Sequence, residues 1–122
     1  MVGALSVSNR YQAVVTSITR VGGVRSACVV DAVDGLVVAE VSRVGTDPGP
    51  LAALAANLTR KLDGALGLAG HGPPRVIHVE AELGHLMLRP VSPEILLVAI
   101  TDSEANLGLL RLALADAAER LD

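Results

Sequence analysis

Aromatic residues are almost absent from the sequence: there is no tryptophan, no phenylalanine and a single tyrosine, Tyr11. Binding sites for nucleic acids usually stack the bases on aromatic side chains. The formal net charge is −3, so the chain also offers no electrostatic attraction to a phosphate backbone. These two deficits argue against nucleic acid as a partner.

Cysteine and long apolar runs are scarce as well. Cys28 is the only cysteine, which excludes an internal disulfide and a zinc site built from several thiolates, and a lone thiol suits a reducing compartment. The longest apolar runs, Leu51–Ala56 and Ile95–Ile100, have six residues each, whereas a membrane-spanning helix needs about 18. The N-terminus also lacks the pattern of a secretory signal. We therefore expect a cytoplasmic protein without membrane insertion.

Apolar residues as a class are abundant, at 51% of the chain. The length of 122 residues fits one domain with one core, and no linker or repeat divides it, so we expect a single domain over residues 1–122. So high an apolar share is difficult for a small monomer to bury. It suggests that another chain covers part of the surface.

Hydrophobic periodicity predicts three helices. The first spans about Asn9–Arg20, and the second spans about Pro50–Leu68 with Thr46 or Asp47 as its cap. The third is marked by apolar residues at helical spacing, with a polar residue before them as the cap. Its apolar positions are Leu107, Leu110, Leu114, Ala118 and Leu121, and its candidate caps are Thr101, Asp102 and Ser103.

Five short strands rich in β-branched residues are predicted between these helices. They span about Arg25–Val30, Leu36–Val41, Arg75–Glu80, Leu86–Val91 and Ile95–Ile100. The short links within each group require antiparallel neighbours. Since "ILLVAI" is apolar on both faces, we expect helices on both faces of the sheet and an α+β sandwich.

The stretch "VVDAVDGLVV" places Asp31 and Asp34 before Gly35, which raises the question of a calcium loop. Such a loop needs oxygen ligands at alternate positions and a glutamate at its twelfth residue. Counted from Asp31, the third residue is Val33 and the twelfth is Ser42. We therefore predict a tight turn between two strands.

Three histidines, His71, His78 and His85, are spaced by seven residues. In the predicted meander, Glu80 lies opposite His85, with His78 diagonal to it on the same face. Three such ligands could hold zinc, but no fourth ligand is visible, so we interpret them as solvated strand residues and predict no metal site.

No motif for catalysis or for a cofactor is present. The glycine-rich "GLAGHGPPR" follows a helix and lacks the GxxxxGK[ST] order of a phosphate loop. There is no GxSxG elbow, and Cys28 and Ser26 lie in a strand without a nearby histidine. Glu80 and Glu82 would point to opposite faces of a strand. We predict a protein that is not an enzyme and needs no cofactor.

The middle helix has a broad apolar stripe, which we expect to face the sheet. The stripe consists of Leu51, Leu54, Ala55, Leu58, Leu62, Ala65, Leu66 and Ala69. Small residues on the opposite side favour close approach by the same helix of a second copy, although a GC-rich genome would also supply alanine and glycine. The following strand, "VIHVE", lacks the proline or lysine that blunts an exposed edge. The predicted dimer interface comprises Ala53, Ala56, Asn57, Arg60, Gly64, Val76 and His78.

Three pieces of sequence resemble the roadblock/LC7 domain family: "GVRSACVVDAVDGL", Gly84 before a strand ending "LRPV", and "TDSEANLGLLR". The resemblance covers about Tyr11–Leu121. It implies a profilin-like five-stranded antiparallel sheet, with the first and last helices on one face and the long middle helix on the other. It also implies dimers joined through the middle helix and the third strand. Bacterial relatives are partners of Ras-like small GTPases, whereas eukaryotic ones serve as dynein light chains or scaffold subunits.

We therefore expect a non-catalytic homodimeric module that binds a Ras-like small GTPase and modulates its nucleotide cycle. Arg60 could be imagined as an arginine finger for the GTPase, but regulators of this family do not generally need one. The alternative is a scaffold or adaptor subunit that joins a sensor kinase or another signalling protein. A small-molecule sensor would require a concave apolar pocket with convergent polar groups, which the scarcity of aromatic residues disfavours.

Overall fold

The computed structural model describes residues 2–43 and 47–122, with side chains described from residue 9 onward. The described residues form three helices and five strands. In chain order they are α1 (Val2–Thr19), β1 (Val24–Asp31), β2 (Leu36–Ser42), α2 (Gly49–Leu68), β3 (Ile77–Ala81), β4 (Gly84–Pro90), β5 (Ile95–Asp102) and α3 (Leu107–Leu121).

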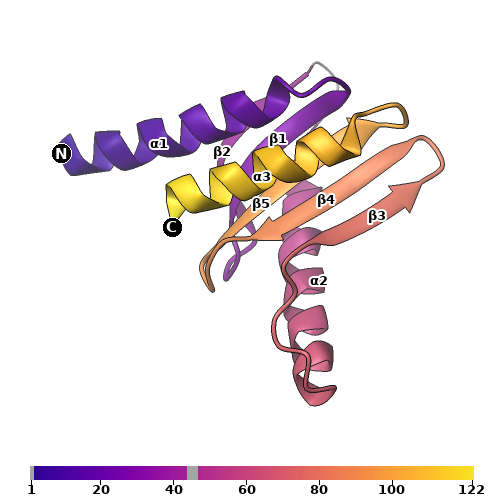
Figure 1. Ribbon diagram of the computed structural model, residues 1–122. Coiled ribbons are helices and arrows are strands. Elements are labelled where there is room, and N and C mark those ends of the chain that lie inside the picture. Colours follow the sequence, from indigo (N-terminus) through magenta and orange to yellow (C-terminus); the bar gives the residue numbers. More distant parts are fainter. Residues whose placement is uncertain (1, 44–46) are drawn as a thin grey trace.

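The five strands form one antiparallel sheet in the order β2-β1-β5-β4-β3. Helices α1 and α3 lie side by side on one face of the sheet, and α2 lies on the other (Figure 1). This arrangement confirms the predicted α+β sandwich. The strand that follows α2 is at an edge of the sheet, as its sequence predicted.

Some element boundaries differ from the prediction. Helix α1 begins at Val2 instead of Asn9, because nothing upstream of the periodic residues interrupts a helix. Strand β3 begins at Ile77 instead of Arg75, and β4 begins at Gly84 instead of Leu86. The β3–β4 pairing runs from Ile77 and Leu88 to Ala81 and Gly84, so β4 begins at the last pair before the turn and β3 begins at the first paired residue.

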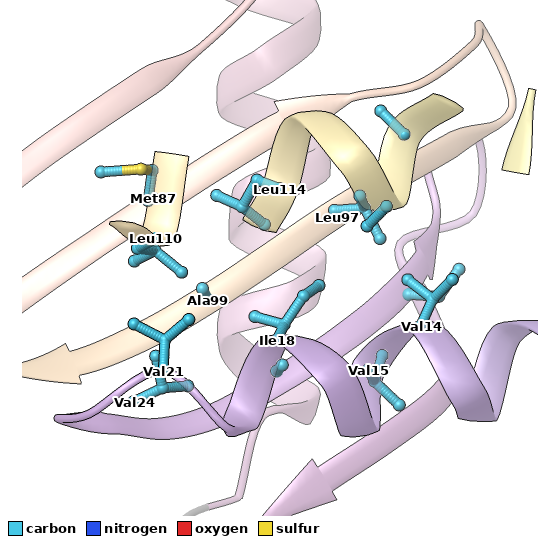
Figure 2. Close-up of a cluster of buried hydrophobic side chains, with 14 residues drawn as sticks. Val14, Val15, Ile18, Val21, Val24, Met87, Leu97, Ala99, Leu110 and Leu114 are labelled. Atoms are coloured by element: carbon cyan, nitrogen blue, oxygen red, sulfur yellow. The ribbon is translucent and has the colours of Figure 1, made fainter. Parts of the chain in front are cut away.

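The larger core lies between the sheet and the pair α1 and α3. Apolar side chains from both helices meet those of β1, β4 and β5 there (Figure 2). Its fully buried large residues include Val14, Ile18, Met87, Leu97, Leu110 and Leu114. Burial of each such side chain contributes about 1.5–3 kcal/mol, so this core holds α1 and α3 to the sheet.

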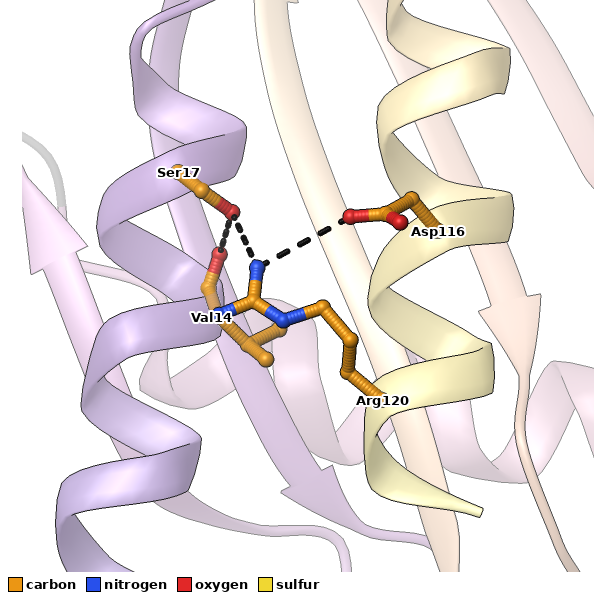
Figure 3. A network of polar contacts seen from close by, with 4 residues as sticks. All are labelled: Val14, Ser17, Asp116 and Arg120. Carbon is orange, nitrogen blue, oxygen red and sulfur yellow. Dashed lines mark hydrogen bonds and ion pairs between the residues drawn. The ribbon is translucent and has the colours of Figure 1, made fainter.

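A polar contact also joins α1 to α3 (Figure 3). Arg120 Nη1 donates to Ser17 Oγ at 3.4 Å and lies 3.8 Å from Asp116 Oδ2, while Ser17 Oγ donates to the carbonyl of Val14 at 2.9 Å. Exposed ion pairs of this kind contribute about 0–1 kcal/mol. The apolar contacts therefore dominate the attachment of the two helices.

The turn between β1 and β2 has the predicted chemistry. Asp31 Oδ1 accepts hydrogen bonds from the backbone N–H groups of Val33 at 2.9 Å and Asp34 at 3.1 Å. Gly35 has a φ of 71°, a left-handed conformation that favours glycine. The two aspartates therefore belong to a tight turn, and the hairpin prediction is confirmed.

The predicted caps of α3 are wrong. Asn106 caps this helix, because its side-chain oxygen accepts from Leu109 N at 3.0 Å. The three predicted candidates, Thr101, Asp102 and Ser103, lie too early, since β5 continues to Asp102 and a turn follows it. At α2 the cap position is Pro48, and Asp47 Oδ1 accepts from Gly49 N at 3.0 Å. Thr46 lies outside the described residues.

Replacement of Gly84 tests how closely strands β4 and β5 pack against each other. A Cβ atom at this position would overlap the carbonyl oxygen of Thr101 on the neighbouring strand. We expect Gly84→Ala to destabilise the fold by about 2 kcal/mol, because backbone must move to relieve the clash. Thermal unfolding followed by circular dichroism measures the change.

Gly64→Ala is the matched control, since a Cβ at Gly64 meets nothing within 4 Å. Alanine is the better helix former by about 1 kcal/mol, so this variant should be slightly more stable than the wild type. Equal unfolding temperatures for Gly84→Ala and the wild type would contradict the described register.

Candidate functional site

The fully buried residues of α2 are alanines, with Leu58 and Leu62 partly buried beside them. Ala52, Ala55 and Ala56 are buried against β1 and β5, whereas Leu54 is 61% exposed. The predicted stripe that begins at Leu51 is therefore turned away from the sheet by about a quarter of a helical turn. The sequence did not reveal this rotation because alanine and leucine both count as apolar in a helical pattern.

Contacts with the β1–β2 turn set the rotation of α2. Arg60 Nη1 donates to the carbonyl oxygens of Ala32 at 2.7 Å and Val33 at 3.0 Å. A Cβ on Gly35 would come within 3.0 Å of Ala53 Cα, so turn and helix are in close contact there. The small residue at position 53 thus accommodates a turn of the same chain.

The structure separates the residues predicted for a dimer interface. Ala56 is 1% exposed and packs inside the chain, so its predicted place on the outer side of α2 is wrong. Val76 packs against the core under α1 and α3, and His78 lies on that face of the sheet beside His85. Ala53, Asn57, Arg60 and Gly64 are exposed on α2. Contact of these four, and of Val76 and His78, with a second copy stays a prediction.

An open apolar face lies beside α2. It comprises Leu54 and Val79, which are exposed, and Leu58, Leu62 and Leu86, which are partly buried against the core beneath α2. Helix α2 packs mainly against β2, β1 and β5, so within the described part of the chain little covers the same side of β3 and β4. Val79 is accordingly 41% exposed, although it is a valine in a sheet. The C-terminal half of α2 also extends past the end of the sheet (Figure 1).

Two of the three histidines come together. His78 Nε2 lies 2.9 Å from His85 Nδ1, and Glu80 pairs with His85 across the strands, as predicted. His85 is only 8% exposed, so its interpretation as a solvated residue is wrong. His71 lies apart, in the loop between α2 and β3. Within the described residues, no group of three potential metal ligands occurs.

Cys28 is buried on the α2 side of β1, at 1% exposure. Loss of hydration raises the pKa of its thiol from 9.0 to about 12, and the nearby carboxylate of Glu40 adds to the rise. The thiolate is the nucleophilic form of cysteine. Cys28 is therefore a core residue and not a reactive one.

Comparison with known proteins places these features in context. The family model of the Roadblock/LC7 domain matches residues 10–101. Among curated proteins, none matches the sequence. No helix in the described part of the chain has the length and apolarity to cross a membrane.

Solved structures resemble the fold closely. MglB of Myxococcus xanthus superimposes with a TM-score of 0.85 at 24% identity, over 93% of this chain and 86% of that one. A Roadblock/LC7 domain from Streptomyces avermitilis gives 0.79 at 22% identity, over 88% of this chain and 91% of that one. Profilin of Schizosaccharomyces pombe gives 0.66 at 18% identity, over 91% and 96% respectively. The likeness to profilin confirms the profilin-like fold.

The thiol of Cys28 provides a test of the core beneath α2. We expect almost no reaction with Ellman's reagent at pH 8 in the folded protein, and complete reaction in concentrated guanidinium chloride. Rapid labelling of the native protein would contradict the burial of this side chain.

The same thiol makes stability depend on pH. Between pH 9 and about pH 12, the unfolded chain loses the thiol proton while the folded chain keeps it. This contribution to stability is therefore present below pH 9 and decreases as the pH rises towards 12. Cys28→Ala, compared with the wild type by denaturant unfolding, should reduce this part of the alkaline loss of stability.

Proposed function

The chain belongs to the Roadblock/LC7 domain family, and from this premise we propose that it is a homodimeric, non-catalytic module that binds a Ras-like small GTPase and modulates its nucleotide cycle. The family is generally regulatory or adaptor in character and is not a family of enzymes. We place the module in the cytoplasm, where its lone cysteine stays reduced.

The observation that carries the proposal is the open apolar face beside α2. Leu54, Leu58 and Leu62 form its wall, and Val79 and Leu86 form its floor, with Leu54 61% and Val79 41% exposed. Contiguous exposed apolar surface of this kind is typical of protein interfaces. The same helix of a second copy fits it, because a two-fold axis would place each α2 against the other copy's open face.

Strand β3 supports the same arrangement. It is an edge strand, and its sequence "IHVEA" contains neither proline nor lysine to prevent pairing. In a two-fold dimer the β3 strands of both copies run antiparallel, so their unpaired backbone groups can join the two sheets. Of the predicted interface residues, Asn57 and Gly64 lie on α2 next to this face, and Ala53 and Arg60 lie nearer the β1–β2 turn.

Regulation of a GTPase does not require a catalytic group from this chain. A partner that binds one arrangement of the switch loops more tightly shifts the GTPase towards that arrangement. Arg60 is poorly suited to act as an arginine finger, since its Nη1 already donates to two carbonyl oxygens of the β1–β2 turn. The proposed mechanism is therefore selective binding.

A scaffold or adaptor role is the second candidate. Helix α3 exposes Leu109 and Leu112, the latter at 69%, on the side of the sheet opposite to α2. A module with apolar surface on both sides can join two proteins, such as a sensor kinase and a second signalling protein, without contact to a GTPase.

The dimer proposal is tested by Leu54→Glu. A carboxylate at this exposed position costs the folded monomer little, but burial of the charge in an interface is strongly unfavourable. We expect light scattering after gel filtration to show twice the chain mass of 12.5 kDa for the wild type and the single mass for the variant.

Two variants complete this test. Leu112→Glu carries the same change on α3 and should remain dimeric. Gly64→Glu probes the small-residue side of α2, so monomers from this variant alone would move the interface there. A Leu54→Glu protein with the wild-type mass would refute the open apolar face as the contact.

The GTPase proposal is tested with Ras-like GTPases from the same genome that carry the GxxxxGK[ST] loop. Each is offered to the immobilised module in its GDP form and with a non-hydrolysable GTP analogue. We expect at least about tenfold preference for one state, which corresponds to 1.4 kcal/mol of differential binding, and a changed rate of hydrolysis or nucleotide release.

Absence of binding in both states would favour the scaffold role. Leu112→Glu distinguishes the two further, because it should leave GTPase regulation intact and weaken an adaptor contact through α3.

A further inference from the structure

A cavity of about 830 Å³ lies between α2, the α2–β3 loop and the β4–β5 turn. Pockets for small ligands usually measure about 300–1,000 Å³. Its walls include Ala32 after β1, Thr59 and Asp63 on α2, and Ser92 in the β4–β5 turn. The leucines of the open apolar face are not among its lining residues, although Ala56 and Arg60 of the predicted dimer interface are.

The walls of this cavity are rigid. Four of the six prolines in the chain line it: Pro73, Pro74, Pro90 and Pro93. Proline fixes the φ angle of the backbone, so these segments lose little freedom when a ligand binds. The backbone N–H of Ala32 donates to the carbonyl of Glu94 at 2.8 Å, which ties the β1–β2 turn to the β4–β5 turn. The cavity is therefore largely formed before any ligand enters.

Positive charge is concentrated around the cavity. Arg60, Arg75 and Arg89 line it together with His71, against one carboxylate, Asp63. The chain as a whole has a net charge of −3, so the charge around the cavity has the opposite sign to that of the whole chain. Arg60 Nη1 is already engaged by the β1–β2 turn, and Arg89 pairs with Leu97 on the face of the sheet that carries α1 and α3, so Arg75 is the cation available to a ligand.

Arg75 has no acidic partner among the side chains that the structure describes. Among the side chains described, in residues 9–43 and 47–122, the ion pair between Arg120 and Asp116 is the only one within 4.0 Å.

Most of the remaining lining is apolar, including Ala56, Ile95 and Leu96 in addition to the prolines. We infer that the cavity binds a small amphiphilic anion, with a phosphate or carboxylate head at Arg75 and a short apolar chain against the alanine and proline walls. Guanidinium groups bind both heads with paired hydrogen bonds. The inference is independent of any GTPase.

Isothermal titration calorimetry tests the inference with four probes: hexyl phosphate, hexanoate, inorganic phosphate and hexanol. We expect hexyl phosphate or hexanoate to bind at least about tenfold more tightly than inorganic phosphate or hexanol, because head and chain each contribute. The better of the two anions identifies the head group. Binding of inorganic phosphate as tight as that of hexyl phosphate would overturn the apolar part of the inference, and no binding of either amphiphile would overturn all of it.

The variant Arg75→Gln tests whether Arg75 binds the head group of the anion. Arg75 is exposed in the α2–β3 loop, so its replacement leaves the core untouched. We expect about tenfold weaker binding of the preferred anion, while Arg111→Gln, the same charge change on α3, keeps wild-type affinity. Unchanged affinity in Arg75→Gln would refute the assigned site.

Amide chemical shifts give a second readout. On titration, the N–H signals of Ala32, Thr59 and Ser92 should move together, since these residues lie on three different walls. Shifts confined to other regions would also overturn the site. The oligomeric mass of Arg75→Gln should equal that of the wild type, so failure here is separable from failure of the dimer proposal.

Discussion

The contact between the β1–β2 turn and α2 determines the orientation of the long helix. Arg60 holds two carbonyl oxygens of the turn, and Gly35 lies against Ala53. With the helix fixed in this rotation, its alanines meet the sheet and its leucines lie to one side. The helix therefore covers only part of the sheet. Both the apolar face over β3 and β4 and the cavity near the β4–β5 turn follow from this incomplete cover.

Short-range chemistry made much of the fold predictable. The Asp31 and Gly35 turn could be predicted because both residues act within the turn itself. Short links within the two groups of strands allowed only antiparallel neighbours, and doubly apolar strands such as β5 required helices on both faces. These inferences depend on a few adjacent residues, so they did not require knowledge of the tertiary arrangement. The family resemblance supplied the placement of the helices, which the structure confirms.

The site could be predicted only in part, because it depends on contacts between distant segments. A helical pattern cannot tell which apolar side meets the sheet, so Ala56 was assigned to the outer side and Leu54 to the inner one, and the structure reverses both. Asn106 replaced the expected caps since the end of β5 is set by pairing with β1 and β4. The cavity has no sequence signature at all. Its walls come from four separate parts of the chain, and prolines and arginines line it, although the scarcity of aromatic residues had disfavoured such a pocket.

The bulge in the β1–β2 pair, between Val29 and Val30, has a consequence for assembly. A sheet with two bare edges can grow in two ways: β3 against β3 closes after two copies, whereas β3 against β2 adds copies without end. A bulge increases the local twist of its strand and interrupts the regular ladder, which makes β2 a poor template for a flat neighbour. The irregularity therefore makes the β2 edge less suited than a regular strand to pairing with another chain.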